Sequence, residues 1–228
     1  MNMHSLPPSA LRGEGMTSQR ARDRLAAKLV EEGITDKRVI EVIRNLARHH
    51  FIDQALHSRA YENTALPIGH GQTISQPYIV ARMSQALIEH GIPDRVLEVG
   101  TGSGYQAAVL AALGTDVVTI ERIPELADEA RASLAAAGYD GVEVVVGDGT
   151  LGMPDRAPFD AIAVAAAAPE MPETLYEQLR PRGRLVVPVG GPVTQRLEVI
   201  VRSPEGPAVV HSVPCRFVPL LGEEGFRG

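Results

Sequence analysis

The amino-acid sequence predicts an α/β fold: a doubly wound, mostly parallel Rossmann-like sheet with extra N-terminal helices and a C-terminal antiparallel hairpin. Short apolar runs alternate with segments of helical period through the middle of the 228-residue chain, as in parallel α/β sheets. The run at 96–99 passes into Gly-Thr-Gly-Ser-Gly, which is typical of a tight turn between a buried strand and a helix. The last two runs, 197–202 and 209–218, alternate apolar and polar residues across a Pro- and Gly-containing segment, 203–207, and so predict the hairpin.

Helical patterns come first along the chain. One carries Leu25, Leu29 and Val30 on a single face and ends at Gly33. A second pattern follows it, and a third, weaker one covers residues 53–61. The candidate caps of the first two helices are Thr17 or Ser18 and Thr35 or Asp36.

Residues 63–76 show no clean period, and one proline and two glycines predict a loop there. The segment is unusually apolar for a solvated connection, and loops held by a rigid scaffold often carry function. Ser75 can then cap a helix that reaches His90, with Pro77 in its first turn.

Strands and helices alternate after this helix. The predicted strands cover residues 96–99, 117–120, 142–146, 161–164 and 184–189, and the predicted helices cover residues 106–113, 124–137 and 172–179. Ligands collect beyond the carboxyl ends of parallel strands where strand order reverses, so we expect the functional residues at those ends.

Composition excludes several kinds of function. A net charge of −6 argues against a broad nucleic-acid-binding surface. Cys215 is the only cysteine and the histidines have no metal-binding spacing, so we expect neither a disulfide nor a metal site. We see no signal-peptide pattern and no apolar run near the roughly 20 residues of a membrane span. These features are compatible with a cytoplasmic protein that binds neither nucleic acid nor membrane.

The glycine-rich turn predicts a nucleoside pocket. Gly100, Gly102 and Gly104 remove side chains from alternate positions, so the backbone can lie against a ligand. Tyr105 occupies the position of the third glycine in the dinucleotide-binding motif Gly-x-Gly-x-x-Gly, and Glu98 lies in the preceding strand. Such a site suits a nucleoside with a cationic amino-acid group, of which S-adenosylmethionine is the obvious candidate. The alternative is a tight turn without a ligand.

Two further carboxylates follow predicted strands. Glu121 lies about 20 residues after the first glycine, where a carboxylate can accept hydrogen bonds from two ribose hydroxyls. The alternative is a capping role before Pro124. Asp148, between Gly147 and Gly149, can accept from the adenine amino group or can simply form a turn.

Ser75 has two interpretations of equal weight, helix cap or residue beside the reacting centre. A nucleophilic serine needs a histidine and an acid in support, and the sequence contains no Gly-x-Ser-x-Gly elbow. Hydrolase chemistry is therefore disfavoured.

Residues 65–77, Ala-Leu-Pro-Ile-Gly-His-Gly-Gln-Thr-Ile-Ser-Gln-Pro, resemble the signature loop of the protein-L-isoaspartate O-methyltransferases. Residues 99–105, 147–149, 158–162 and 216–220 also resemble that family, and the likeness extends from about residue 17 to 221. The glycine loop is shared by many S-adenosylmethionine enzymes, whereas the signature loop and the 216–220 segment are highly specific. Thr150 departs from the family, because bacterial members often have an aromatic residue there.

The resemblance implies a repair reaction: methyl transfer from S-adenosylmethionine to the α-carboxylate of an L-isoaspartyl residue in a damaged protein or peptide, leaving S-adenosylhomocysteine. The methyl ester would then close to a succinimide, and hydrolysis would return some normal aspartate. By family analogy Ser75 is the catalytic-site residue. The predicted cofactor contacts are Thr73, Ile74, Ser75, Glu98, Gly100, Gly102, Ser103, Gly104, Glu121, Arg122, Gly147, Asp148 and Gly149. The predicted substrate contacts are Ala65, Leu66, Pro67, Ile68, Ile74 and Val218.

The domain organisation follows from this assignment. A mobile tail (1–16) precedes a single methyltransferase domain (17–228), made of N-terminal helices and substrate loop (17–76), cofactor-binding core (77–190) and C-terminal hairpin (191–228). One alternative is an S-adenosylmethionine-dependent methyltransferase for a small molecule, which leaves the signature loop unexplained. A second is a nucleotide-binding regulatory module that uses the same pocket.

Overall fold

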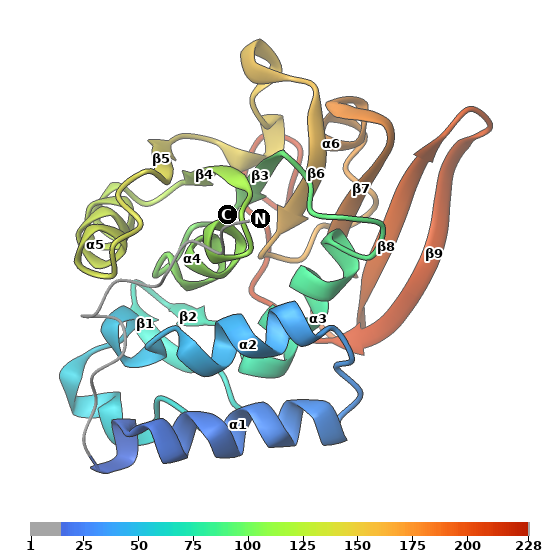
Figure 1. Ribbon diagram of the computed structural model, residues 1–228. Helices are drawn as coiled ribbons and strands as arrows, with labels where there is room; N and C mark the ends of the chain where they lie inside the picture. Colours follow the sequence, from blue (N-terminus) through green and yellow to red (C-terminus); the bar gives the residue numbers. More distant parts are fainter. Residues whose placement is uncertain (1–14, 228) are drawn as a thin grey trace.

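The computed structural model describes residues 15–227, and its centre is a seven-stranded sheet (Figure 1). The strand order is β5-β4-β3-β6-β7-β8-β9, with parallel pairing from β5 to β7 and antiparallel pairing from β7 to β9. The strands are β3 (Arg95–Val99), β4 (Asp116–Glu121), β5 (Glu143–Val146), β6 (Phe159–Val164), β7 (Leu179–Gly190), β8 (Gln195–Ser203) and β9 (Gly206–Cys215). The predicted doubly wound sheet with an antiparallel hairpin at one edge is confirmed.

Strand order reverses beside β3, which pairs with β4 on one side and with β6 on the other. The Gly100 N–H donates to the Ile120 carbonyl at 2.8 Å, and the Ala165 N–H donates to the Val99 carbonyl at 2.8 Å. The carboxyl ends of the three strands therefore lie together. This is the switch point at which α/β sheets bind their ligands.

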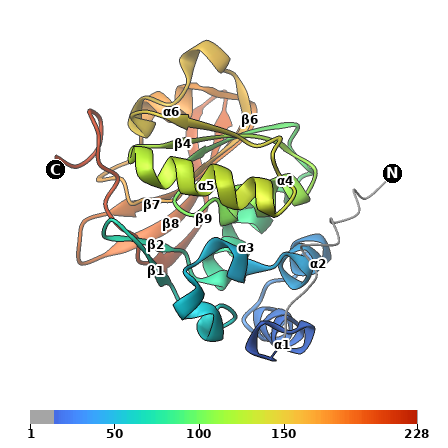
Figure 2. The ribbon, with the colours of Figure 1, turned by 90° about the vertical axis from the view of Figure 1, so that its left-hand side faces the viewer.

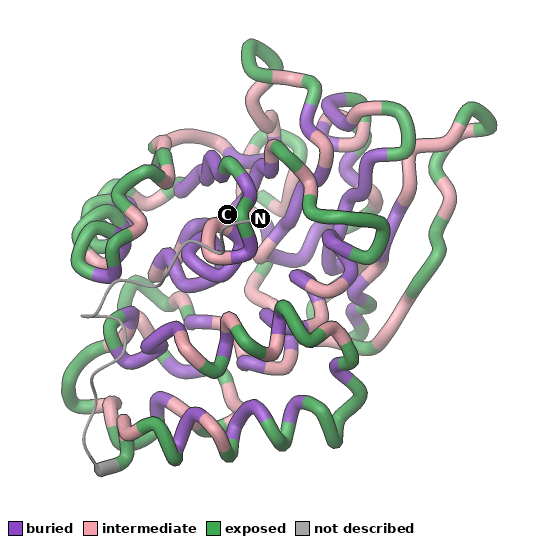
Figure 3. Tube along the Cα trace, viewed as in Figure 1, coloured by how far each residue is buried: buried purple, intermediate pink, exposed green. Residues whose placement is uncertain are grey.

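Helices cover both faces of the sheet. Successive strand residues point to opposite faces, so Val96 packs with one set of helices and Leu97 with the other. Figure 2 shows α4 and α5 over one face, and Figure 3 shows the central strands as buried. Glu98 shares the face of Val96. The helices on that face are α3 (Pro77–Leu87), α4 (Tyr105–Ala112) and α5 (Pro124–Ala136), and α6 (Glu173–Glu177) packs on the other.

The N-terminal helices α1 (Gln19–Glu31) and α2 (Lys37–Asn45) pack against each other and against α3. Asp36 caps α2 by accepting from the N–H groups of Arg38 and Val39, whereas Ser18 lies at the N-cap of α1 without a side-chain capping bond. The weaker helical stretch is a run of 3-10 turns, η3 (Arg48–Phe51) and η4 (Gln54–Arg59). Of the predicted tail, residues 1–14 lie outside the described residues, and η2 (Gly15–Thr17) is a 3-10 turn.

The prediction of an irregular loop at 63–76 is wrong, because a small antiparallel hairpin lies there. Strand β1 (Leu66–Gly69) pairs with β2 (Gln72–Ile74), with Leu66 opposite Ile74. Leu66 and Ile74 are both buried, so the apolar residues that looked unusual for a loop anchor the hairpin to the body.

The last strand ends at Cys215, three residues before the predicted end at 218, because the chain there changes partners. The Gln195 side chain pairs with the backbone of Phe217. The Ala167 N–H then donates to the Val218 carbonyl at 2.8 Å, and the Leu220 N–H donates to the Ala167 carbonyl at 2.8 Å. The chain thus returns to the end of β6.

Short 3-10 turns η5 (Gly149–Leu151) and η6 (Pro154–Arg156) complete the described structure, in which no helix has the length and apolar character of a membrane span.

Candidate active site

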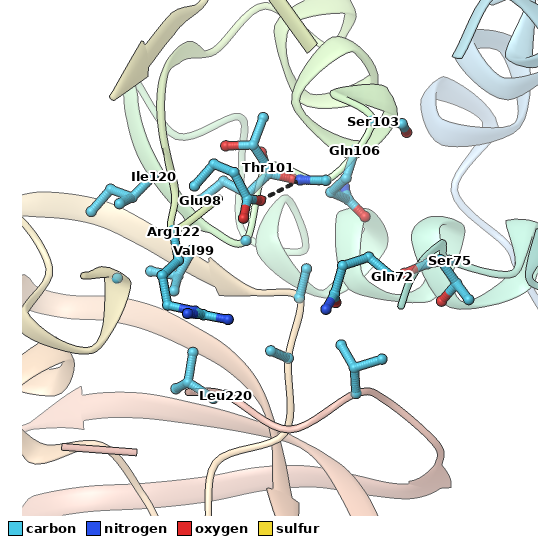
Figure 4. Close-up of a pocket in the computed structure, with 18 of the residues that line it drawn as sticks. Gln72, Ser75, Glu98, Val99, Thr101, Ser103, Gln106, Ile120, Arg122 and Leu220 are labelled. Atoms are coloured by element: carbon cyan, nitrogen blue, oxygen red, sulfur yellow. Dashed lines mark hydrogen bonds between the residues drawn. The ribbon is translucent and has the colours of Figure 1, made fainter. Parts of the chain in front are cut away.

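A pocket opens at the switch point, beyond the carboxyl ends of β3, β4 and β6 (Figure 4). It holds about 860 Å³ of empty space, part of which is open to solvent. The end of the β1–β2 hairpin, the glycine loop with its flanks, the end of β4 and the C-terminal segment around Val218 line most of it. Val80 of α3, Gly149 after β5, and Ala165 and Ala166 after β6 complete the lining. The signature loop and the glycine loop therefore contribute to one cavity.

The glycine loop presents its backbone to the pocket. Gly102 has a φ of +53°, which favours glycine, and its N–H donates to the Glu121 Oε2 at 2.9 Å. A Cβ on Gly102 would lie 3.4 Å from the Ile68 Cδ1, so the hairpin packs closely against this loop. Gly100 and Ser103 also line the pocket, as predicted.

Glu98 is a buried carboxyl beside the cavity. Its Oε2 accepts from the Thr119 hydroxyl at 2.6 Å, and its Oε1 has no partner among the described residues. Burial raises the pKa of Glu98 to about 8, and the charge of Glu121 adds to this rise against the opposing hydrogen bond from Thr119. A buried carboxyl with an unused oxygen is an acceptor for a cationic group, so this site fits the ammonium of an S-adenosyl amino acid.

Glu121 is held in a fixed orientation at the end of β4. Besides the bond from Gly102, its Oε1 accepts from the Ile123 N–H at 3.0 Å, immediately before α5. The predicted capping interaction is therefore present. Each carboxylate oxygen retains a second lone pair, so the same side chain, which lines the pocket, can also accept from ribose hydroxyls.

Ser75 is not a helix cap. Helix α3 begins at Pro77 with Gln76 at the N-cap, and it ends at Leu87 rather than at His90. Ser75 is half-buried and lines the pocket together with Gln72 of the hairpin, also seen in Figure 4. Its backbone carbonyl accepts from the Arg48 Nη1 at 2.9 Å. The structure thus removes the alternative explanation of this serine.

Most predicted cofactor residues are brought together, and three are not. Those that line the pocket are Thr73, Ile74, Ser75, Glu98, Gly100, Gly102, Ser103, Glu121, Arg122 and Gly149. Gly104, Gly147 and Asp148 do not. Gly104 has a φ of +86°, and a Cβ there would lie 3.1 Å from the Leu134 Cγ, so it serves the packing of α4 against α5.

Asp148 forms a turn, the second of its predicted roles. Its Oδ1 accepts from the N–H of Thr150 at 2.9 Å and from the hydroxyl of Thr150 at 2.6 Å, and its Oδ2 accepts from the Glu223 N–H at 2.7 Å. This carboxylate therefore holds the C-terminal segment instead of facing the cavity. A side chain on Gly222 would collide with it.

The predicted substrate residues divide in the same way. Ile74 and Val218 line the pocket, whereas Ala65, Leu66, Pro67 and Ile68 lie outside its lining, in or beside β1. Several lining residues were not among the predicted contacts: Gln72, Val80, Val99, Thr101, Tyr105, Gln106, Ile120, Ile123, Ala165, Ala166, Pro219, Leu220 and Leu221. Those of the C-terminal segment depend on its return to β6, which no local pattern reveals. Among residues 15–227, no group of three His, Cys, Asp or Glu side chains could hold a metal ion.

Comparison with known proteins agrees with this geometry. The family model of protein-L-isoaspartate(D-aspartate) O-methyltransferases matches residues 20–225. The chain is 52% identical over 218 residues to the protein-L-isoaspartate O-methyltransferase of Alkalilimnicola ehrlichii, covering 95% of this chain and 99% of the relative. It is 55% identical over 217 residues to that of Stenotrophomonas maltophilia, covering 95% of each chain.

Solved structures show the same relationship. A protein-L-isoaspartate O-methyltransferase superposes with a TM-score of 0.80 at 27% identity, covering 90% of this chain and 67% of that one. A Plasmodium falciparum structure in complex with S-adenosyl-L-homocysteine superposes with a TM-score of 0.74 at 25% identity, covering 88% and 98%. The chain therefore belongs to the protein-L-isoaspartate(D-aspartate) O-methyltransferase family and is an S-adenosylmethionine-dependent methyltransferase.

Proposed function

We propose that this chain repairs damaged proteins by methylating the α-carboxylate of L-isoaspartyl residues, and that it does so by orientation, without a general base. The observation that carries this proposal is that the end of the β1–β2 hairpin and the glycine loop line the same cavity. The glycine loop suits the methyl donor, and the hairpin belongs to the segment most specific to the family.

The chemistry requires no acid–base pair, so both carboxyls of the lining, Glu98 and Glu121, can serve the cofactor. S-adenosylmethionine, when bound, supplies an electrophilic methyl group on a positively charged sulfur. A peptide α-carboxylate has a pKa of about 3.3–3.9 and is already ionised at neutral pH. No proton has to be removed before attack, and among residues 15–227 no His, Lys or Cys lines the pocket. Orientation alone can contribute about 7–11 kcal/mol to such a reaction.

We assign the cofactor-side roles from the groups that the pocket presents. Glu98 accepts from the ammonium through its unpartnered oxygen, and Glu121 accepts from the ribose hydroxyls. The backbone of Gly100 and Gly102 lies against the amino-acid portion. Arg122, after Glu121, and Gly149, after β5, lie where the adenine end would rest. The remaining proposed contacts are Thr73, Ile74, Ser75 and Ser103.

We assign the substrate side to the hairpin and the C-terminal segment. Ser75 orients the attacking carboxylate with its hydroxyl, and Ile74 and Val218, which also line the pocket, contact the peptide. The backbone of 65–68 forms the outer part of this surface. A mostly apolar segment that offers backbone groups can bind a peptide main chain while tolerating many sequences.

Transfer of a labelled methyl group to a matched pair of peptides tests the function. The pair differs only in an L-isoaspartyl or an L-aspartyl linkage at one residue. We expect rapid, base-labile labelling of the isoaspartyl peptide and about background labelling of its twin. Equal labelling of both peptides, or of neither, rejects the proposal.

We also propose a cytoplasmic location with aged proteins as partners, supported by a composition that includes one cysteine, Cys215. Cell fractionation tests this placement. Recovery of the enzyme in the periplasmic or membrane fraction would contradict it.

A further inference from the structure

Arg48 is a buried cation that the assigned chemistry does not use. It is the first residue of η3, and its side chain is 0% exposed. Its Nε donates to the Ala60 carbonyl at 2.9 Å, its Nη1 to the Ser75 carbonyl at 2.9 Å, and its Nη2 to the Thr64 carbonyl at 3.4 Å. Its guanidinium carbon lies 5.2 Å from the centre of the Tyr105 ring.

No carboxylate within residues 15–227 forms an ion pair with Arg48. Burial lowers the pKa of this guanidinium to about 10. Removing a charge from water is unfavourable unless hydrogen bonds and aromatic contacts compensate for it. Here backbone carbonyls and one ring provide that compensation, so the side chain is tied to the exact course of the chain around it.

The acceptors of Arg48 have a distinctive place in the fold. Thr64 lies just before β1 and Ser75 lies just after β2, so the guanidinium joins the two ends of the hairpin. Tyr105 is the first residue of α4, directly after the glycine loop, and it also lines the pocket. One side chain therefore links the substrate side, the catalytic-site residue and the cofactor side.

We propose that Arg48 is a positioning residue for methyl transfer, holding the Ser75 backbone and the base of the hairpin at a fixed place relative to the glycine loop. The proposal rests on the proposed function, because it requires that Ser75 acts on the substrate carboxylate. Arg48 does not line the pocket itself and acts through Ser75 and Tyr105. The planar guanidinium offers five N–H donors in a fixed fork, and here it reaches three carbonyls from separate nitrogens while it faces an aromatic ring. A lysine ammonium carries its three donors on a single nitrogen and cannot reproduce that geometry.

Arg22 provides a matched control. It is also a buried arginine, 1% exposed against 0% for Arg48, and its Nη1 donates to a backbone carbonyl, that of Asn45, at 3.1 Å. It lies on α1 and does not line the pocket. A purely structural role for buried arginines predicts similar consequences at the two positions.

The test compares Arg48→Met, Arg48→Lys and Arg22→Met with the wild-type enzyme, well below each melting temperature. kcat and KM are measured with an isoaspartyl peptide, and the Kd of S-adenosylhomocysteine is measured by calorimetry. We expect Arg48→Met to lower kcat by about 100-fold, since a displacement of about 1 Å can have that effect. Arg48→Lys should fall between Arg48→Met and wild type, the Kd should change by less than about threefold, and Arg22→Met should keep its kcat within about twofold.

Two outcomes overturn the proposal: wild-type kcat in a folded Arg48→Met enzyme, or an equal loss of kcat in Arg22→Met. If Arg48→Met does not fold, Arg48→Lys decides, and an unchanged kcat in that variant overturns the proposal. A wild-type enzyme that binds S-adenosylhomocysteine but methylates no isoaspartyl peptide rejects the proposed function instead, and this role with it.

Discussion

Binding of the cofactor should release a proton from Glu98. Burial, reinforced by the charge of Glu121, raises the pKa of this carboxyl to about 8 from its ordinary 4.5, although the Thr119 hydrogen bond opposes the rise. At pH 7 about ten molecules of the empty enzyme carry the proton for each that lacks it. A cationic ligand group favours the carboxylate, so ionisation at pH 7 takes about 1.4 kcal/mol from the binding free energy. Affinity for S-adenosylhomocysteine should therefore rise nearly tenfold from pH 6 to pH 7 and level off above about pH 8.

Calorimetry in two buffers of different ionisation enthalpy, such as phosphate and Tris, measures this proton directly. At pH 7 we expect release of about 0.9 proton per molecule of S-adenosylhomocysteine bound. Glu98→Gln keeps the size of the side chain but cannot ionise. It should bind more weakly and release no proton.

The raised pKa of Glu98 also makes the stability of the folded protein depend on pH. The folded-state pKa lies above the ordinary value of 4.5, so the native protein retains a proton that the unfolded chain releases between pH 4.5 and about 8. Stability of the empty wild-type enzyme should fall across that window, and Glu98→Gln should lack this part of the fall. Identical binding enthalpies in the two buffers, or the same pH profile in Glu98→Gln, would refute the reasoning.

Three further predictions concern single residues. Ser75→Ala should lower kcat by at least about tenfold. Its effect on stability should be well under about 1 kcal/mol, because Gln76 and not Ser75 holds the N-cap position of α3. Steady-state kinetics and thermal melting measure the two effects, and an unchanged kcat contradicts the prediction. Gly104→Ala should destabilise the protein by about 1–2 kcal/mol or more, because Gly104 has a φ of +86° and Leu134 lies close to the added Cβ. The folded variant should keep its affinity for S-adenosylhomocysteine. A tenfold loss of affinity would show instead that residue 104 contacts the ligand. Asp148→Ala should free the C-terminal segment by removing the acceptor for the Glu223 N–H, so carboxypeptidase should remove residues after 221 faster than in wild type, and equal rates would contradict this.

The parallel core could be predicted because local chemistry determines it. The alternation of apolar strands with helical segments fixes the fold class, and Gly114 and Gly138 follow the ends of α4 and α5 with positive φ values, which favour glycine. The glycine loop, Glu98 and Glu121 all fall at carboxyl ends of neighbouring strands, which parallel topology brings together.

The β1–β2 hairpin could not be predicted because its strands are too short to show an alternating pattern. Its turn also requires a left-handed conformation at a residue that is not glycine, His70 with a φ of +51°. When the hairpin is not recognised, the sequence suggests that α3 begins just after Ser75, and a capping role for this serine becomes plausible. Once the hairpin is seen, Ser75 belongs to the pocket.

The roles of Asp148 and Arg48 could not be predicted from the sequence either. The position of Asp148 after β5 predicts a ligand, but a segment 75 residues later in the chain supplies the donor that occupies its Oδ2. Arg48 bonds carbonyls 12, 16 and 27 residues away, and a backbone acceptor leaves no trace in the sequence. Both roles depend on long-range contacts of the main chain.

The arrangement of the two ligands in the pocket tests the central claim most directly. A crystal structure of the enzyme with S-adenosylhomocysteine and an isoaspartyl peptide should show the peptide α-carboxylate between Ser75 and the sulfur, with the ammonium on Glu98. A peptide bound away from the β1–β2 hairpin, or a nucleoside bound away from the glycine loop, would contradict the account.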